Sequence, residues 1–158
     1  MKEPIRVRMA EYSIGKCPDI LVTIGLGSCI GIALYDSFSK IGGLVHIMLP
    51  KDNRNGLKPS KYADTGIPFL IKKMIESGAV KNKLIAKIAG GAHMFSNTGD
   101  ISFQIGKRNI EAVRQILSEQ NIPIVGEDIG DNYGRTMEFY TVDGSVKIRT
   151  YKKGNIII

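Results

Sequence analysis

The N-terminal third of the chain alternates short apolar runs with short polar connections, a pattern that predicts β-strands. Apolar and β-branched residues fill Leu21–Ile24, Ile30–Tyr35 and Leu44–Leu49. The polar segment Asp36–Lys40 between the last two runs has the length of a hairpin connection. Because strands joined by short connections usually pair, we expect three successive antiparallel strands here. Ile5–Ile14 alternates in part and predicts one strand before them.

Two later segments have the spacing of helices. In Ser60–Gly78, apolar residues recur three and four positions apart, and Gly78 stands where such a helix would end. Pro68 interrupts this segment, which indicates either an irregular first turn or a kink. The same spacing in Asn109–Gln120 predicts a second helix, preceded by a polar loop over Ser96–Ser102.

Strands dominate the remainder of the chain. Strand-like runs occupy Leu84–Ala89, Ile124–Ile129, Arg135–Val142 and Ser145–Tyr151. The dipeptide Asp143-Gly144 between the last two is a strong hairpin signal. The pattern predicts an α/β protein of the α+β type, with a largely antiparallel core, two stacked sheets and about two or three helices. At 158 residues, the chain is expected to form a single domain over residues 1–158.

Composition narrows the class of protein. The formal net charge of +7 favours acidic partners. The lysines are scattered, however, and no basic block is interleaved with aromatic residues, so a nucleic-acid partner is not expected. The N-terminal segment MKEPIRVRMAEYSI lacks the apolar core of a signal peptide, and no run approaches the ~18–20 apolar residues that cross a bilayer. Since two cysteines make no disulfide framework, we expect a cytoplasmic protein without membrane insertion.

Cys29 and His46 are the residues of the predicted hairpin that carry chemistry. A turn centred on Ser37–Phe38 would place Cys29 opposite His46. A centre one residue later would shift the register and is expected to turn one side chain to the other face. Side chains directly opposite each other have Cβ atoms ~5 Å apart. At that distance the imidazole can take the thiol proton and leave a nucleophilic thiolate.

Two further groups would complete such a site. Thr23, on the preceding run, is a candidate to hold the imidazole by its other nitrogen. The backbone N–H groups of Gly27, Ser28 and Cys29 would approach a substrate carbonyl, and the Cys29 amide is the first choice of oxyanion donor. The structural alternative stays open, because a buried cysteine is usually an inert hydrophobe and a histidine in an apolar run is usually a core residue.

The remaining cysteine and histidine are weaker candidates. Cys17 lies in a predicted turn and is expected to be a bystander. His93 follows Gly90-Gly91 and is a rival base that we rank below His46. The cysteines and histidines are too far apart in sequence for a zinc site, and GGAH lacks the spacing of a nucleotide-binding loop. We therefore expect neither a metal nor a cofactor.

The run GLGSCIGIALYD, followed by GGLVHIMLP, resembles the signature of CheD, the chemoreceptor glutamine deamidase family of bacterial and archaeal chemotaxis. Further segments resemble the family in the same order: KYADTGIPFLIKKMIESGA, AKIAGGAHMF, IGKRNIEAV and GRTMEFYTVDGSVKIRTY. The resemblance extends over nearly the whole chain.

This resemblance implies a hydrolytic enzyme that converts specific glutamine side chains of chemoreceptors to glutamate. The catalytic set of the family falls on Cys29 as nucleophile, His46 as general base and acid, and Thr23 as the residue that orients His46. The resemblance also implies two partners, the cytoplasmic helices of chemoreceptors and CheC, a phosphatase of phosphorylated CheY that regulates the deamidase. The alternatives are a non-catalytic adaptor for CheC or the receptor, and a general cysteine amidase or protease.

Overall fold

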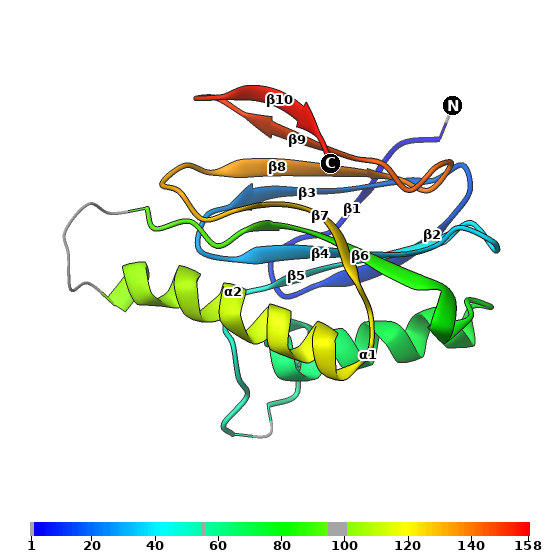
Figure 1. Cartoon of the computed structure of the whole chain (residues 1–158), viewed down its shortest axis with the longest axis horizontal. Helices are drawn as coiled ribbons and strands as arrows, with labels where there is room; N and C mark the ends of the chain where they lie inside the picture. The colour runs from blue at the N-terminus through cyan, green and yellow to red at the C-terminus, as the bar shows by residue number, and fades with distance from the viewer. Residues whose placement is uncertain (1, 55, 95–100) are drawn as a thin grey trace.

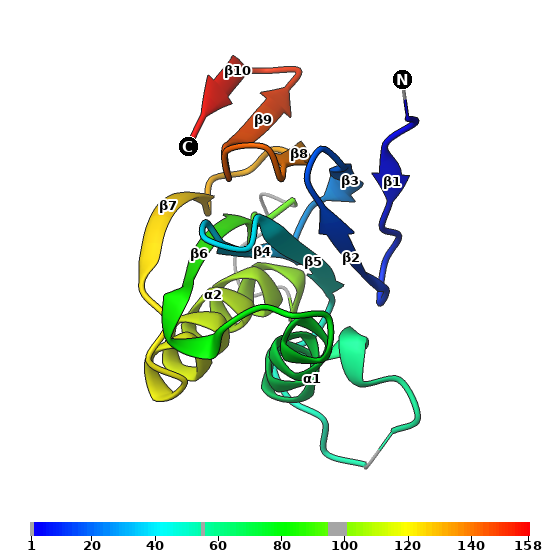
Figure 2. The same cartoon turned by 90° about the vertical axis from the view of Figure 1, so that its right-hand side faces the viewer.

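Two β-sheets and a layer of helices make up the part of the chain that the computed structural model describes, residues 2–54, 56–94 and 101–158. Figure 2 shows the order of the layers: one sheet, then the second sheet, then the helices against the outer face of the second sheet. The predicted α+β class with two stacked sheets is confirmed.

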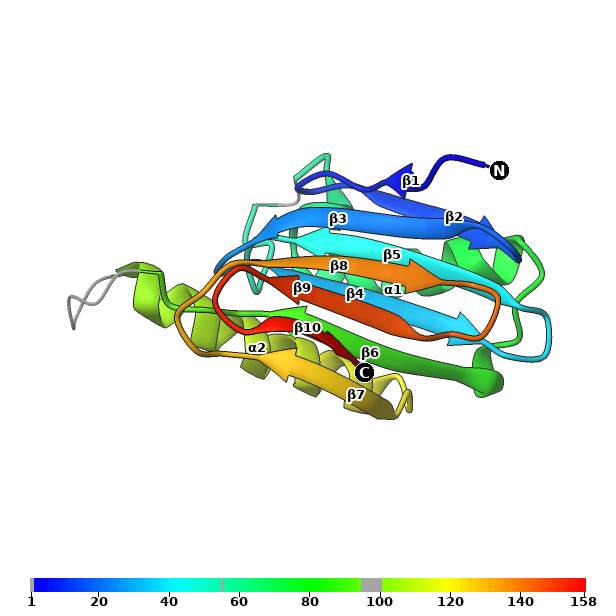
Figure 3. The same ribbon diagram turned by 90° about the horizontal axis from the view of Figure 1, so that it is seen from above.

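The two sheets have five strands each in the described part of the chain (Figure 1). Sheet A has the spatial order β1 (Ile5–Arg6), β3 (Ile20–Leu26), β8 (Arg135–Tyr140), β9 (Val146–Thr150) and β10 (Gly154–Ile157). Sheet B has the order β2 (Tyr12–Lys16), β5 (Ile41–Ile47), β4 (Ile30–Asp36), β6 (Leu84–Gly90) and β7 (Ile124–Ile129). Most neighbours are antiparallel, but β1–β3 and β6–β7 are parallel pairs. The strands of the two sheets run along nearly the same axis (Figure 3).

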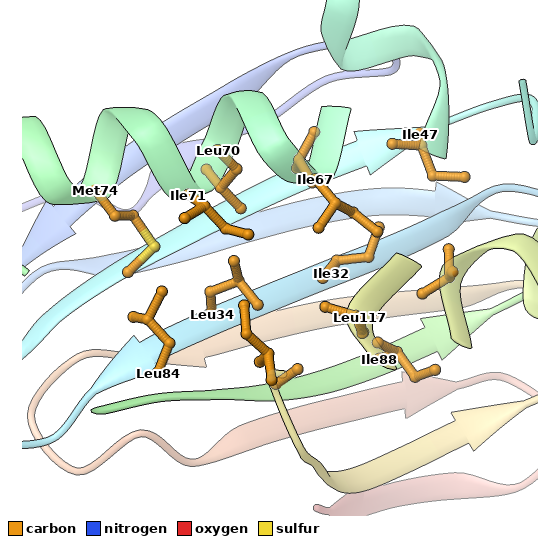
Figure 4. Packing of buried hydrophobic residues seen from close by; sticks show 14 of the residues in the cluster. Ile32, Leu34, Ile47, Ile67, Leu70, Ile71, Met74, Leu84, Ile88 and Leu117 are labelled. Carbon is orange, nitrogen blue, oxygen red and sulfur yellow. The ribbon is translucent and has the colours of Figure 1, made fainter. Parts of the chain in front are cut away.

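Strands β4 and β5 are buried along their whole length, because sheet A covers one face and the helices cover the other. Burial on both faces explains why their sequences are unbroken apolar runs without alternation. Figure 4 shows the layer between sheet B and the helices, where these side chains meet: Ile32, Leu34, Ile67, Leu70, Met74 and Leu117. A second apolar cluster fills the space between the two sheets, with Leu21, Leu44, Met137 and Phe139 among its members.

Two strand predictions near the N-terminus were wrong. Leu21–Ile24 does form a strand, but β3 lies in sheet A between β1 and β8 and is not a neighbour of β4. Ile5–Ile14 is not one strand, because β1 and β2 belong to different sheets and Ala10, with φ of 61°, lies between them. A short apolar run carries no signal that tells which of two stacked sheets it joins.

Helix α1 (Ala63–Glu76) runs through Pro68 and is followed by Gly78, whose φ is 111°, so the predicted end is correct. Its start is later than expected, because Ser60 lies in a preceding 3-10 turn, Pro59–Lys61. A second 3-10 turn, Lys81–Lys83, leads into β6. Neither α-helix in the described residues combines the length and apolarity that a membrane crossing requires.

Helix α2 spans Ile101–Glu119 and begins earlier than the prediction at Asn109. Of the polar loop expected over Ser96–Ser102, residues 96–100 lie outside the described residues, while the last two belong to α2. Gly106 lies inside the helix. A Cβ there would lie 2.6 Å from the carbonyl oxygen of Ala92, so glycine is needed for this close approach of helix and loop.

Candidate active site

Cys29 and His46 lie on the face of sheet B that sheet A covers. The β4–β5 hairpin pairs Gly31 with His46, so its centre is one residue beyond Ser37–Phe38. The expectation that this register turns one side chain away was wrong, because it moves each partner by two residues and residues two apart share a face. Cys29 belongs to the apolar cluster between the sheets, and so does Leu44, two residues from His46.

Thr23 reaches His46 from the opposite sheet. Its Oγ1 lies 2.7 Å from Nδ1 of His46 and 2.6 Å from the carbonyl oxygen of Val7. All three contacting groups are buried, and both side chains have no exposed surface. Gly31 leaves the space in which this contact forms, since a Cβ there would lie 2.7 Å from the sulfur of Met137 and 3.4 Å from the methyl group of Thr23.

This contact determines which nitrogen of the imidazole carries the proton. A threonine hydroxyl has one proton, and the carbonyl oxygen of Val7 can only accept. The hydroxyl therefore donates to Val7 and accepts from Nδ1–H of His46. Nε2 is left with the lone pair that a general base needs. This atom is buried and has no hydrogen-bond partner among the described residues.

Burial sets the charge of the Cys29 and His46 side chains. Desolvation lowers the pKa of His46 to about 4, so the imidazole is neutral near pH 7. Desolvation also raises the pKa of the Cys29 thiol, opposed in part by a hydrogen bond from its own backbone N–H. The resting pair is a neutral thiol and a neutral imidazole. If Cys29 acts as a nucleophile, its thiolate has to form as the proton is transferred to His46.

The loop that carries Cys29 is fixed through its carbonyl groups. Each of its three carbonyl oxygens accepts a hydrogen bond: Gly27 from Ala92 N–H (2.9 Å), Ser28 from Asn109 Nδ2 (2.9 Å) and Cys29 from Gly91 N–H (2.8 Å). The donors come from the segment after β6 and from α2. Three consecutive peptide planes are thereby held in one orientation before any substrate binds.

The backbone N–H groups of this loop differ in their availability. The N–H of Gly27 donates to the carbonyl oxygen of Gly25 at 3.2 Å. The N–H of Cys29 lies beside its own sulfur, where it stabilises negative charge.

Gly90, with φ of 116°, packs so closely against the loop that a Cβ there would overlap the Cys29 carbonyl oxygen.

Sequence reasoning missed two contributors to this geometry. Gly90-Gly91 was considered only as a phosphate loop, and Asn109 only as the start of a helix. Asn109 is fully buried, with its side chain directed at the loop before Cys29. Its only sequence signal is its place in IGKRNIEAV, one of the segments that resemble the CheD family.

Of the two weaker candidates, Cys17 lies far from His46, whereas His93 follows Ala92, whose N–H donates to the carbonyl oxygen of Gly27. Cys17 is exposed, and its N–H donates to the carbonyl oxygen of Lys40, at the opposite end of β5 from His46. The backbone N–H of His93 donates to the carbonyl oxygen of Asp131 at 3.0 Å. Across the described residues, His, Cys, Asp and Glu side chains form no group of three that could hold a metal ion.

Comparison with known proteins extends the resemblance. The family model for CheD chemotactic sensory transduction matches residues 48–150. A protein from Clostridium novyi is 54% identical over 157 residues, covering 97% of this chain and 96% of the relative. A protein from Caldanaerobacter subterraneus subsp. tengcongensis is 52% identical, covering 95% of this chain and 94% of the relative. Both carry the name "Probable chemoreceptor glutamine deamidase CheD".

A solved structure gives a much weaker likeness. The crystal structure of the Bacillus licheniformis hypothetical protein YfiH aligns with a TM-score of 0.49 at 16% identity, over 74% of this chain and 49% of that one. The two relatives, in contrast, cover 95% or more of this chain, and the family model covers residues 48–150. This chain belongs to the CheD family.

Proposed function

We propose that this chain hydrolyses the side-chain amide of chemoreceptor glutamines to glutamate, with Cys29 as nucleophile, His46 as general base and acid, and Thr23 as the residue that orients His46. The observation that carries this proposal is the 2.7 Å contact between Thr23 Oγ1 and His46 Nδ1. It leaves a bare Nε2 on the face of sheet B that also bears Cys29. The names of the relatives supply the class of substrate.

The reaction follows from these groups. As the sulfur of Cys29 attacks the carboxamide carbon, Nε2 of His46 takes the thiol proton and the carbonyl electrons move to oxygen. Among the amides of Gly27, Ser28 and Cys29, the Cys29 N–H is the proposed first donor to this oxyanion, because it belongs to the residue whose sulfur attacks. The Gly27 N–H is already paired with the carbonyl oxygen of Gly25. The imidazolium then protonates the leaving nitrogen, the oxyanion re-forms the carbonyl as the C–N bond breaks, and ammonia departs to leave a thioester between Cys29 and the substrate. Water attacks the thioester while His46 takes its proton, and the products are glutamate and the free thiol.

The test is the intact mass of a receptor cytoplasmic fragment incubated with the protein. Each conversion of NH₂ to OH adds about 1 Da, and we expect Cys29→Ala to abolish this gain. Cys17→Ala is the matched control, because that thiol is exposed and lies away from His46. An unchanged mass gain with Cys29→Ala would overturn the proposal. Binding without any mass gain would favour a non-catalytic adaptor, and a cleaved backbone would favour a protease.

We also propose a cytoplasmic location, which the receptor substrate requires, and CheC as a regulatory partner. The net charge of +7 supports an acidic partner surface. Attraction of this kind is screened by salt, so the affinity for CheC is expected to fall about tenfold or more between about 0.05 and 0.5 M salt. Titration calorimetry with purified CheC measures this. The absence of binding at low salt would remove CheC from the proposal and leave the deamidase assignment intact.

A further inference from the structure

Asn109 joins the loop of the nucleophile to the strand of the base. The side chain comes from the middle of α2 and has no exposed surface. Its Nδ2 donates to the carbonyl oxygen of Ser28 at 2.9 Å, one residue before Cys29. It also donates to the carbonyl oxygen of Met48 at 3.0 Å, two residues after His46. One carboxamide therefore bridges the two segments that carry the reactive side chains.

The orientation of this carboxamide follows from its partners. Both protons of Nδ2 are used, and the two acceptors are carbonyl oxygens that cannot donate. If the amide were rotated by half a turn, Oδ1 would face two oxygens, so the rotated form is excluded. Oδ1 itself is buried and has no hydrogen-bond partner among the described residues. A buried polar side chain that leaves one atom unpaired carries a cost in stability, which points to a purpose other than stability.

The contact with Ser28 also aims the neighbouring N–H group. In a trans peptide the C=O and N–H groups point in opposite directions. Because the carbonyl of Ser28 is turned toward Asn109, the N–H of Cys29 is turned away from α2. This is the same N–H that stabilises the sulfur of Cys29. The geometry thus links Asn109 to both the proposed oxyanion donor and the thiol.

We propose that Asn109 is a positioning residue, which sets the separation of Cys29 from His46 and directs the Cys29 N–H at the developing oxyanion. It acts through two backbone carbonyl groups and not through the reacting atoms. This inference rests on the proposed function, in which His46 activates Cys29. If Asn109 holds the pair together, removal of its carboxamide uncouples the thiol from the imidazole even when the chain stays folded.

The experiment measures this coupling through the rate at which iodoacetamide alkylates Cys29 at pH 7. All chains carry Cys17→Ser, so that a single thiol reacts. Four chains form a double-mutant cycle: the parent, His46→Ala, Asn109→Ala and the combination. With Asn109 present, His46→Ala is expected to slow alkylation by about tenfold or more, whereas in the Asn109→Ala background the effect of His46→Ala is expected to fall below about threefold.

A matched control separates positioning from general stability. Thr141 is also fully buried, and its hydroxyl donates to the carbonyl oxygen of Asp19 at 2.6 Å. Thr141→Val removes a buried side-chain-to-backbone hydrogen bond, so it is expected to lower Tm without changing the effect of His46→Ala. If Asn109→Ala does not fold, Asn109→Asp replaces it. Asn109→Asp keeps the shape of the side chain. Burial favours the protonated form of its carboxyl group, which has a single O–H donor for the two carbonyl oxygens of Ser28 and Met48.

The outcomes distinguish this proposal from the proposed function. An undiminished effect of His46→Ala in folded Asn109 variants would overturn the role of Asn109, even if the parent chain deamidates receptors. Coupling through Asn109 in a chain that deamidates no receptor fragment would support the positioning role and overturn the proposed function alone.

Discussion

The proposed chemistry depends on the acceptor to which the single hydroxyl proton of Thr23 is donated. Thr23→Val keeps the shape of the side chain but leaves the Val7 carbonyl and His46 Nδ1 unpaired in a buried space. We expect the free energy of unfolding to fall by about 1–3 kcal/mol, and kcat to fall by about 10- to 100-fold because the imidazole is no longer held. Urea unfolding and deamidation kinetics measure the two effects. Thr23→Ser is expected to restore both, and an equal loss with serine would argue against the hydroxyl.

His46 makes stability depend on pH. Its pKa is about 4 in the folded chain, against 6.5 for an ordinary histidine. Between these values the unfolded chain binds a proton that the folded chain does not, so stability rises with pH through this window and is lost as the pH falls. The contribution of His46 to this loss is about 3 kcal/mol at about 1.4 kcal/mol for each pKa unit.

Urea unfolding at pH 7 and at pH 4 tests this contribution. The His46→Gln side chain does not titrate. This variant is therefore expected to lose less stability than the parent between pH 7 and pH 4, by the contribution of His46. If the free energy of unfolding falls equally in the parent and in His46→Gln, the pH dependence belongs to other groups.

The placement of the candidate residues was partly predictable from sequence. Cys29 and His46 follow each other on a short hairpin, so their placement on one face depends on local geometry alone. Asn109 could not be predicted in the same way, because its two acceptors, Ser28 and Met48, are more than 60 positions away in sequence and are brought to it by packing of α2. A helical pattern states which face is apolar and does not reveal a polar contact that only the tertiary fold creates.

At the scale of elements, the turn after β6 supports the loop that carries Cys29 and depends on glycine. Gly90→Ala would force a Cβ into the carbonyl oxygen of Cys29 at a φ of 116°. We expect it to cost about 3 kcal/mol or more in stability and to reduce alkylation of Cys29. Gly130→Ala is the control, since Gly130 also has positive φ (79°) but faces open space. Its cost is expected to be about 1–2 kcal/mol from the backbone conformation alone. Equal costs for the two variants would show that the contact with Cys29 is unimportant.

The elements themselves were largely predictable, and their partners were not. Helix α1 and the β4–β5 hairpin have strong local signals, a 3.6-residue period and a polar connection between apolar runs. The assignment of β3 to sheet A depends instead on pairing with β8, more than 100 residues later. The first half of α2 was missed because Gly106 and the polar residues after it are typical of a turn, while the helix is maintained by contact with Gly91 and Ala92.

At the scale of the whole molecule, we propose that residues 1–158 unfold as one domain. The two sheets share an apolar cluster, and the Thr23–His46 contact crosses between them. We expect one urea transition, with coincident midpoints by circular dichroism and by tyrosine fluorescence, for which the chain has six tyrosines and no tryptophan. Two separated transitions would show that the sheets fold independently.

The contact between Thr23 and Val7 has a consequence for the start of the chain. Val7 is held beside β3 by a hydrogen bond from its N–H to the carbonyl oxygen of Val22 (2.8 Å). The carbonyl oxygen of Val7 in turn accepts the hydrogen bond that the hydroxyl of Thr23 donates. Deletion of residues 2–8 would free that proton to point at Nδ1 instead. The imidazole would then also adopt the tautomer with hydrogen on Nε2, the form that cannot accept a proton from sulfur. A truncated chain would retain Cys29, His46 and Thr23. Only the fraction of its molecules with the original tautomer, however, could carry out the proposed transfer of the thiol proton to His46.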